Sequence, residues 1–238
     1  MFLKKYLKIF IYFFKYLFLC QKGASILMYH SVDYNNVFFT VKPEMLETQM
    51  KYLKNNNYNV IKLSDLIDIL KYNNKIPKKI VVLTFDDGYN DNYTNVFPIL
   101  KKYNFPATIF LITGLIGKEI NNSQNITLKA LNWDEIQEMH NSGLVDFQPH
   151  TVNHRESNQQ EIIDSKKEIE KKLGKKCEFF AYPRGLYNKE IIDTLKNNGF
   201  KAARTVERGK VNQGDNLFKL KSVSVNSTTS FVQFRANL

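Results

Sequence analysis

The chain has 238 residues, 43% of them hydrophobic, which suits one large α/β domain better than two small ones. Lys and Arg number 34 against 23 Asp and Glu, so the net charge is +11. Such an excess indicates an anionic neighbour, although Lys and Asn are abundant throughout and the excess can also be compositional bias. No nucleic-acid motif is present, so we expect no nucleic-acid partner. The two cysteines form no C-x-x-C pair, which excludes a cysteine-ligated zinc site.

Residues 1–22, within "MFLKKYLKIFIYFFKYLFLCQKG", have a basic start followed by an apolar stretch, as in a signal peptide or signal anchor. Lys15 interrupts the apolar stretch, which is short for a spanning helix, and no small-residue cleavage site follows. Lysines among large aromatics also suit an amphipathic helix lying in a membrane interface. A helix that caps the domain is the other interpretation. We predict that residues 1–22 associate with a membrane and that residues 23–238 form the folded domain. The sequence does not determine which side of the membrane the domain lies on.

The rest of the chain alternates between strand-like and helical patterns. The expected strands are 24–32, 58–63, 78–88, 106–117, 144–152, 177–185, 201–206 and 217–225. The expected helices are 43–56, 64–74, 95–104, 132–143, 158–174 and 189–200. This alternation, without a G-x-G-x-x-G or P-loop fingerprint, predicts parallel strands with outer helices in a closed barrel or an open sheet. In either fold, functional groups gather at the C-terminal ends of the strands.

Two adjacent carboxylates, Asp86 and Asp87 in "TFDDGY", end one apolar strand. Buried carboxylates are unfavourable unless they are paired, hydrogen-bonded or bound to a metal. Two of the four histidines, His150 and His154 in "FQPHTVNH", end another strand and would share one face if that segment turns helically. Two His and one carboxylate form a ligand set for catalytic Zn²⁺ or another divalent metal. The other Asp could then accept a proton from the attacking water. Either motif alone is also common in turns and on surfaces.

Three motifs, "TFDDGY", "HTVNH" and "FAYPRG", occur in an order that resembles the polysaccharide deacetylase family, carbohydrate esterase family four. The similarity covers roughly residues 24–225. It implies a distorted (β/α)7 barrel and a metal-dependent removal of acetyl groups from N-acetylated or O-acetylated sugars. It also implies that Asp86 is the base and that Asp87, His150 and His154 bind the metal. We expect Zn²⁺, with Ni²⁺, Co²⁺ and Fe²⁺ as alternatives.

The third motif matches the family only in part. The resemblance implies that the backbone N–H of Arg184, after Pro183, donates to the oxyanion, and that Gly185 allows the tight turn. The family usually places an arginine near the base, and the matching position here is Ala181. Arg184 and Arg204 are the candidates to orient the base instead.

The family's general acid usually comes from a C-terminal Leu-x-His, yet no histidine follows His154. His30 in "ILMYHSV" is the candidate replacement, as in the branch that resembles poly-N-acetylglucosamine deacetylases. The first and last strands of a barrel are neighbours, so His30 could reach the site. A packed core histidine is the equally weighted alternative. We expect His140, on a helix, at the surface.

Aromatic residues near these motifs are candidate sugar contacts: Tyr89, Trp133 and Tyr182. Trp133 could instead pack at the start of its helix. The expected partner is an acetylated amino-sugar glycan, and the oligomeric state stays open. A carbohydrate-binding scaffold without activity, or a metallohydrolase acting on another amide or ester, are the alternative functions.

Overall fold

A computed structural model describes residues 23–72, 75–121, 126–154 and 158–238. The segment predicted to associate with a membrane, residues 1–22, lies outside this range. No helix within the described ranges is long and apolar enough to cross a bilayer.

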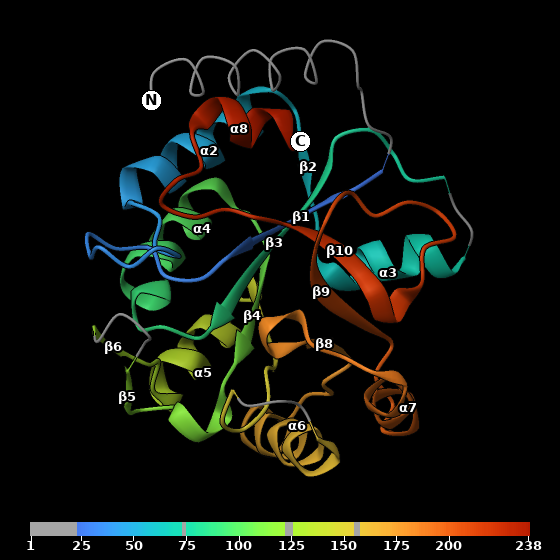
Figure 1. The fold of residues 1–238 in the computed structure, drawn as a ribbon. Helices are drawn as coiled ribbons and strands as arrows, with labels where there is room; N and C mark the ends of the chain where they lie inside the picture. The colour runs from blue at the N-terminus through green and yellow to red at the C-terminus, as the bar shows by residue number, and fades with distance from the viewer. Residues whose placement is uncertain (1–22, 73–74, 122–125, 155–157) are drawn as a thin grey trace, which may run out of the picture.

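The structure alternates strands and helices in the order that the sequence predicts (Figure 1). The strands are β1 (Ser25–Tyr29), β2 (Asn59–Val60), β3 (Ile80–Asp87), β4 (Ala107–Leu111), β5 (Glu119–Asn121), β6 (Thr127–Lys129), β7 (Val145–Pro149), β8 (Phe179–Ala181), β9 (Ala202–Arg208) and β10 (Leu220–Ser224). The α-helices are α2 (Pro43–Asn55), α3 (Leu63–Lys71), α4 (Phe97–Tyr103), α5 (Trp133–Asn141), α6 (Gln159–Leu173), α7 (Lys189–Asn197) and α8 (Phe231–Ala236). Short turns of other helix types are η1 (Asn92–Val96), η2 (Thr113–Leu115), η3 (Pro183–Gly185) and η4 (Leu217–Lys219).

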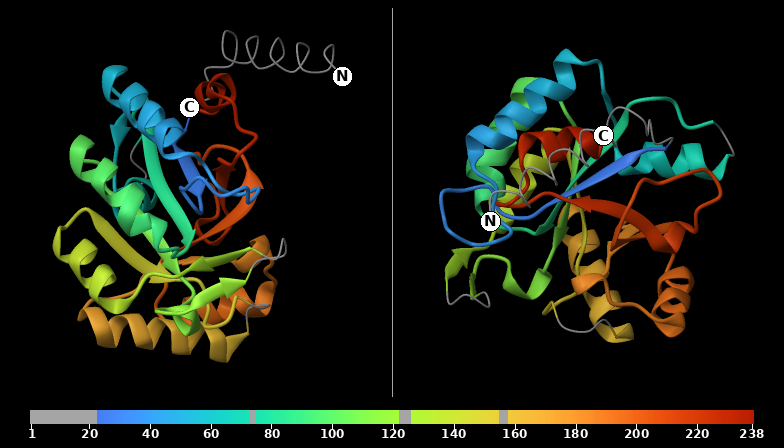
Figure 2. Two further views of the ribbon diagram at one scale, coloured as in Figure 1. Left: turned by 90° about the vertical axis from the view of Figure 1, so that its left-hand side faces the viewer. Right: turned by 45° about the horizontal axis from the view of Figure 1, so that its top comes forward.

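Seven parallel strands form a nearly closed barrel in the order β7-β4-β3-β1-β10-β9-β8, with the short β2 paired beside β3. Helices cover its outside (Figures 1 and 2). The expected distorted (β/α)7 barrel is therefore confirmed. The first and last strands are neighbours, as predicted, with Leu27 opposite Val223 and Met28 opposite Ser224.

Strand β3 is buried along all eight of its residues, which explains why its sequence reads as an unbroken apolar run. The covering helices show one apolar face instead. In α2, Leu46, Met50 and Leu53 lie four and three residues apart and are all buried, and Pro43 occupies the start of the helix.

The barrel has a seam between β7 and β8, because no backbone ladder joins these two strands. The buried side chain of Gln148 closes part of it, since its oxygen accepts hydrogen bonds from the backbone N–H groups of Glu178 and Phe179, both at 3.0 Å. The seam is thus closed by side chains where backbone pairing ends.

Two parts of the fold differ from the sequence prediction. The strand expected over 106–117 ends at Leu111, and the chain continues into η2 and the antiparallel hairpin β5–β6. Helix α8 was not predicted. It packs against α2, where the ring of Phe231 meets that of Tyr52 edge-on at 5.4 Å (Figure 1).

Candidate metal centre

Asp87, His150 and His154 come together at the C-terminal ends of β3 and β7. Oδ1 of Asp87 lies 3.6 Å from Nε2 of His150 and 3.5 Å from Nε2 of His154. Ligands held ~2.1 Å from one tetrahedral ion lie about 3.4 Å apart, close to these separations. Within the described chain, Asp87 Oδ1 is buried and has no hydrogen-bond partner. The donor set and this unpartnered oxygen fit a divalent cation bound among the three side chains.

The backbone conformation at the end of β3 sets the directions of both carboxylates, Asp86 and Asp87. Successive strand residues normally point to opposite faces. Asp87 adopts a φ of 74°, in the left-handed region that non-glycine residues rarely occupy. Of the seven described non-glycine residues with positive φ, three lie in this site: Asp87, Thr151 and His154. Backbone strain is therefore concentrated where the candidate chemistry is.

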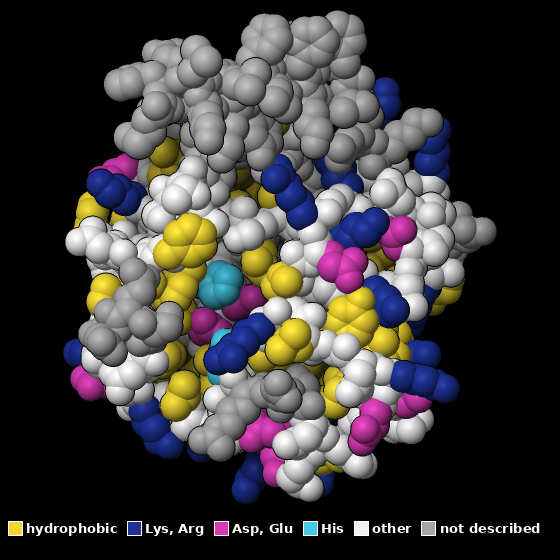
Figure 3. Space-filling model, in the orientation of Figure 1, with side chains coloured by type: hydrophobic (Ala, Val, Ile, Leu, Met, Phe, Trp, Pro, Cys, Tyr) yellow, Lys and Arg dark blue, Asp and Glu magenta, His cyan; other side chains and the backbone are white. Residues whose placement is uncertain are grey.

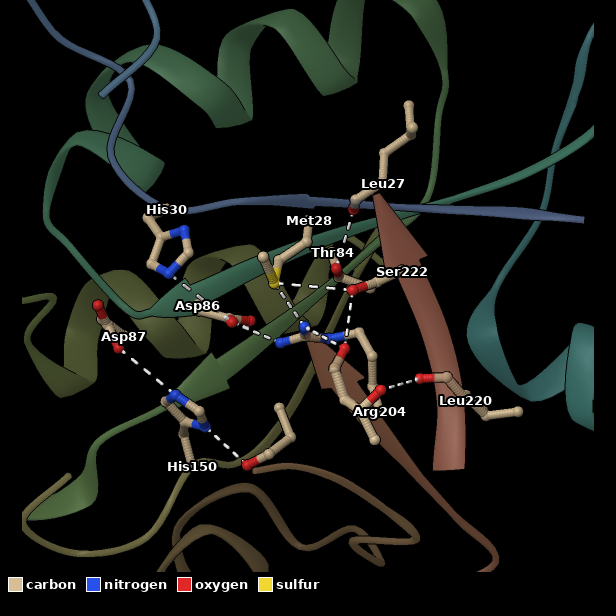
Figure 4. Close-up of polar contacts among 12 residues, drawn as sticks. Leu27, Met28, His30, Thr84, Asp86, Asp87, His150, Arg204, Leu220 and Ser222 are labelled. Atoms are coloured by element: carbon tan, nitrogen blue, oxygen red, sulfur yellow. Dashed lines mark hydrogen bonds and ion pairs between the residues drawn. The ribbon is translucent and has the colours of Figure 1, made fainter. Parts of the chain in front are cut away.

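His150 has a fixed tautomer. Its Nδ1 lies 2.8 Å from the carbonyl oxygen of Ala181 across the β7–β8 seam, and a carbonyl can only accept, so Nδ1 carries the proton. Burial lowers the pKa of His150 to about 4, so the imidazole is neutral at neutral pH. Nε2 consequently offers its lone pair towards Asp87 Oδ1 and the metal position (Figure 4).

The two histidines do not share a helical turn, contrary to the expectation from their spacing. The segment after β7 is a loop in which Thr151 and His154 have φ of 67° and 54°, and His154 N–H donates to Thr151 Oγ1 at 3.0 Å. Glu161, in the first turn of α6, accepts from the N–H groups of Val152 and Asn153 at 2.9 and 2.8 Å. These side-chain contacts hold the loop in the form that brings both imidazoles to Asp87.

Asp86 is buried and forms an ion pair with Arg204 of β9, whose Nη2 donates to Asp86 Oδ2 (Figure 4). Burial would raise the pKa of Asp86, but the Arg204 guanidinium outweighs it and lowers the pKa below its usual range. Asp86 Oδ1 is buried without a hydrogen-bond partner in the described structure. Asp86 is therefore an oriented, ionised carboxylate with one oxygen available.

Of the two candidates to orient Asp86, the structure places Arg204 against it. The side chain of Arg204 is 1% exposed, and its Nη1 also contacts Met28 Sδ at 2.6 Å. Arg184 is exposed and lies in the turn η3. Ala181, at the position of the family's usual arginine, is buried in β8.

His30 follows β1 and reaches the same site. Its Nε2 lies 3.9 Å from Asp86 Oδ2 (Figure 4). Its ring lies 5.4 Å from the ring of Phe39. The side chain is 22% exposed, so His30 is neither a fully packed core histidine nor a free surface residue. His140 is partly buried rather than at the surface, and it precedes β7, at the opposite end of that strand from His150.

The third motif forms the tight turn η3. Its two turn hydrogen bonds are donated by the N–H groups of Gly185 and Leu186, so the Arg184 N–H is not used within the turn. Gly185 has a φ of 74°, and a Cβ there would lie 2.4 Å from Cγ2 of Val206. Pro183 is buried. The turn therefore requires glycine at position 185 for both conformational and steric reasons.

The three aromatic candidates for sugar contact differ in position. Tyr89 is 3% exposed, and its hydroxyl donates to Asp87 Oδ2 at 2.9 Å. Tyr182 is 1% exposed, and its hydroxyl donates to the carbonyl of Phe218 at 3.0 Å. Neither ring has a free face for a sugar in this conformation. Trp133 starts α5, is partly buried against the core, and has the Lys172 ammonium 5.4 Å from its ring.

Sequence reasoning missed that Tyr89 contacts Asp87. Burial, then the Asp87 charge, raises the pKa of Tyr89 well above its usual range, so the hydroxyl stays protonated and donates. Because Asp87 Oδ2 accepts this bond, Oδ1 is the oxygen left for the metal. The only signal in the sequence is that Tyr89 follows Asp87 by two residues. That spacing is equally typical of an exposed aromatic residue.

Histidine and acidic side chains are visible in a hollow of the surface bordered by hydrophobic side chains (Figure 3). A family model described as polysaccharide deacetylase matches residues 73–203, more than half of the chain. The chain belongs to the polysaccharide deacetylase family. This polysaccharide deacetylase is similar to YxkH of Bacillus subtilis, with 33% identity over 218 residues that cover 89% of this chain and 74% of that protein. It is similar to a poly-β-1,6-N-acetyl-D-glucosamine N-deacetylase of Staphylococcus epidermidis, with 31% identity covering 79% and 69%.

Solved structures agree with this assignment. IcaB from Ammonifex degensii superposes on this polysaccharide deacetylase with a TM-score of 0.81 at 25% identity, covering 91% of this chain and 98% of that chain. The Streptococcus pyogenes deacetylase PplD, solved in complex with acetate, gives a TM-score of 0.76 at 28% identity, covering 87% and 94%.

We predict that Tyr89→Phe weakens metal binding by ~10–100-fold, the usual effect of losing a hydrogen bond to a ligand. Without the phenol, Asp87 Oδ2 is free and the carboxylate can rotate. Chelator competition for Zn²⁺ measures the dissociation constant, and the visible spectrum of the Co²⁺ form reports coordination. Tyr182→Phe removes a buried phenol hydrogen bond elsewhere and serves as the control. Metal affinity equal to that of the unaltered protein in Tyr89→Phe would contradict the prediction.

Proposed function

We propose that this polysaccharide deacetylase is a metal-dependent hydrolase that removes acetyl groups from N-acetylated sugars of a surface or lipid-linked glycan. The observation that carries the proposal is the placing of Asp86, an oriented and ionised carboxylate, directly beside the Asp87–His150–His154 cluster. The names of the Staphylococcus epidermidis relative and its counterparts support an amino-sugar substrate. Zn²⁺ is the proposed ion, and Ni²⁺, Co²⁺ or Fe²⁺ suits the same ligands.

The first half of the reaction is a proton abstraction. A divalent ion held by Asp87, His150 and His154 would polarise the acetyl carbonyl and acidify the attacking water. Asp86 takes the proton of that water through Oδ1, the oxygen that Arg204 leaves unbonded. Arg204 keeps the carboxylate ionised and fixed in orientation, which lowers the reorganisation needed during attack.

The second half is the departure of the amine. The backbone N–H of Arg184 donates to the oxyanion that develops on the acetyl oxygen. His30, whose Nε2 lies 3.9 Å from Asp86 Oδ2, protonates the leaving nitrogen. Acetate and the free amino sugar are the products, and the proton taken by Asp86 balances the proton given by His30 over the cycle.

The decisive experiment is acetate release from N-acetylglucosamine oligomers by the purified, metal-loaded protein. We expect Asp86→Asn to retain metal and to lose ~10²–10⁴-fold in turnover, the usual contribution of a general base. His30→Ala should also retain metal, with a larger loss on N-acetyl amides than on O-acetyl esters, because an alkoxide leaves with less help than an amine. Binding of oligomers without acetate release would support a carbohydrate-binding scaffold, and release only from other amides or esters would support a different metallohydrolase.

Arg204→Met should change the pH profile. Without the guanidinium, burial dominates and raises the pKa of Asp86, so less of it is ionised at low pH. The acidic limb of kcat/KM against pH should therefore move to higher pH, while Zn²⁺ affinity stays unchanged. Arg208→Met on the same strand, where the guanidinium is exposed and bonds Asn237, is the control. An unmoved acidic limb would show that Asp86 does not depend on Arg204.

We also propose that residues 1–22 tether the enzyme to a membrane surface, with the net charge of +11 assisting on acidic lipids. Full-length protein should sediment with membranes at physiological salt, and a chain beginning at residue 23 should stay in the supernatant with full acetate release. Full-length protein that remains in the supernatant would assign the segment to a structural cap.

A further inference from the structure

Asp91 is a buried carboxylate that the proposed chemistry does not use. It is 9% exposed and precedes the turn η1 after β3. Its oxygens accept hydrogen bonds from the Ser31 hydroxyl at 2.6 Å, the Val32 N–H at 3.0 Å and the Asn92 side-chain amide at 2.8 Å. Burial is the largest influence on its pKa, which is raised to about 6, so Asp91 is ionised at neutral pH despite being buried. Burying the charged Asp91 carboxylate is unfavourable, which indicates that this residue has a role besides packing.

The contacts of Asp91 and its neighbours replace backbone pairing. Strand β1 pairs with β3 only as far as Tyr29. Beyond that point, the carbonyl of His30 accepts from Asn92 Nδ2 at 2.9 Å, and the carbonyl of Val32 accepts from Asn95 Nδ2 at 2.8 Å. Side chains from η1 therefore continue the attachment of the chain that carries His30.

The other side of this loop is also held. The carbonyl of Ser31 accepts from Val41 N–H at 3.0 Å, and Asp33 N–H donates to the Val41 carbonyl at 3.1 Å. Asp91 adds two charge-assisted hydrogen bonds to consecutive residues directly after His30, the strongest class of contact available to the loop. The loop is thus clamped between Val41 and the carboxylate of Asp91.

We propose that Asp91 is a positioning residue that fixes the imidazole of His30 beside Asp86, in position to donate a proton to the leaving nitrogen. It acts through the backbone and hydroxyl of Ser31 and Val32, and it touches neither substrate nor metal ligands. The inference rests on the proposed function, because it assigns the carboxylate a part in the delivery of the acid. A displacement of an acid by about 1 Å can lower turnover by ~10²-fold, so such an anchor matters.

The test is a double-mutant cycle on the metal-loaded, full-length protein. Asp91→Ala should lower kcat on N-acetylglucosamine oligomers by ~10–10²-fold and lower it less on an O-acetyl ester. In the His30→Ala background, Asp91→Ala should leave the remaining turnover within about twofold, because the group that it positions is already gone. Zn²⁺ affinity should be unchanged. Asp91→Asn keeps an acceptor for the Val32 N–H and should restore most of the turnover.

Two further variants make the test specific. Asp33→Asn makes the same change as Asp91→Asn in the same loop. Among the described residues the Asp33 carboxylate accepts only from the Tyr34 N–H, so this variant should leave all rates unchanged. Asn95→Ala removes one donor to the loop from a partly buried position, and should show the same substrate-selective loss on a smaller scale. If Asp91→Ala does not fold, Asn95→Ala carries the cycle, and its loss should likewise vanish in the His30→Ala background.

Equal losses in the His30 and His30→Ala backgrounds, or a loss of Zn²⁺ affinity that parallels the loss of rate, would overturn the positioning role. A protein that releases no acetate at all would overturn the proposed function instead. NMR of the His30 imidazole then decides the structural claim. One sharp set of resonances that broadens or doubles in Asp91→Ala, with His140 unchanged, supports it, and identical spectra overturn it.

Discussion

The ion pair between Arg204 and Asp86 is the interaction on which the interior of the barrel depends. β9 and β3 are separated by β10 and β1 in the sheet, so the pair spans the inside of the barrel rather than a ladder between neighbours. The guanidinium also contacts Met28 of β1 and lies 5.4 Å from the ring of Phe110 of β4. Removal of one partner from a buried ion pair typically destabilises a protein by about 3–5 kcal/mol, because a charge is left without compensation. The fold and the ionisation of the base are therefore set by the same contact.

The two adjacent carboxylates are compensated in different ways, which lets them do different work. Asp86 is paired with a permanent cation and keeps one oxygen free. Asp87 faces two imidazoles and accepts a hydrogen bond from Tyr89. A bound cation would compensate the negative charge of its carboxylate. Groups of the same type in one site usually acquire separate roles through such differences in surroundings. The positive φ of Asp87 makes the division possible, because a regular strand would send the two side chains to opposite faces.

Much of this arrangement could be predicted from the sequence, since it follows from periodicity and from strand ends. The alternation of strands and helices placed Asp86, Asp87 and His150 at one end of parallel strands, and the barrel closure placed β1 beside β10. Contacts between residues distant in sequence could not be predicted in the same way. Arg204 lies 118 residues from Asp86, and no local pattern links them. The helical turn expected from H-x-x-x-H does not form: Thr151 and His154 have positive φ, and Glu161 of α6 binds the N–H groups of Val152 and Asn153 in a loop.

The two elements that the sequence prediction missed differ in their local signals. Ser230 and Gln233 form a capping box at the start of α8, a pattern that marks a helix N-terminus in sequence. The β5–β6 hairpin had no comparable signal, since its strands are only three residues each. Its position is set by tertiary contacts instead, with Ala130 bridging to Tyr89 and the Leu131 N–H donating to the Gly88 carbonyl.

The seam of the barrel connects the fold to the candidate metal centre. β7 and β8 share no backbone ladder, and the bond between His150 Nδ1 and the Ala181 carbonyl crosses the gap at its C-terminal end. The same bond fixes the tautomer that leaves Nε2 available to a metal. A ligand therefore takes part in closing the barrel, and any widening of the seam would also turn an imidazole away from Asp87. Gln148 holds the seam two residues before His150. The geometry of the metal centre therefore depends on a side chain that does not contact the metal ligands.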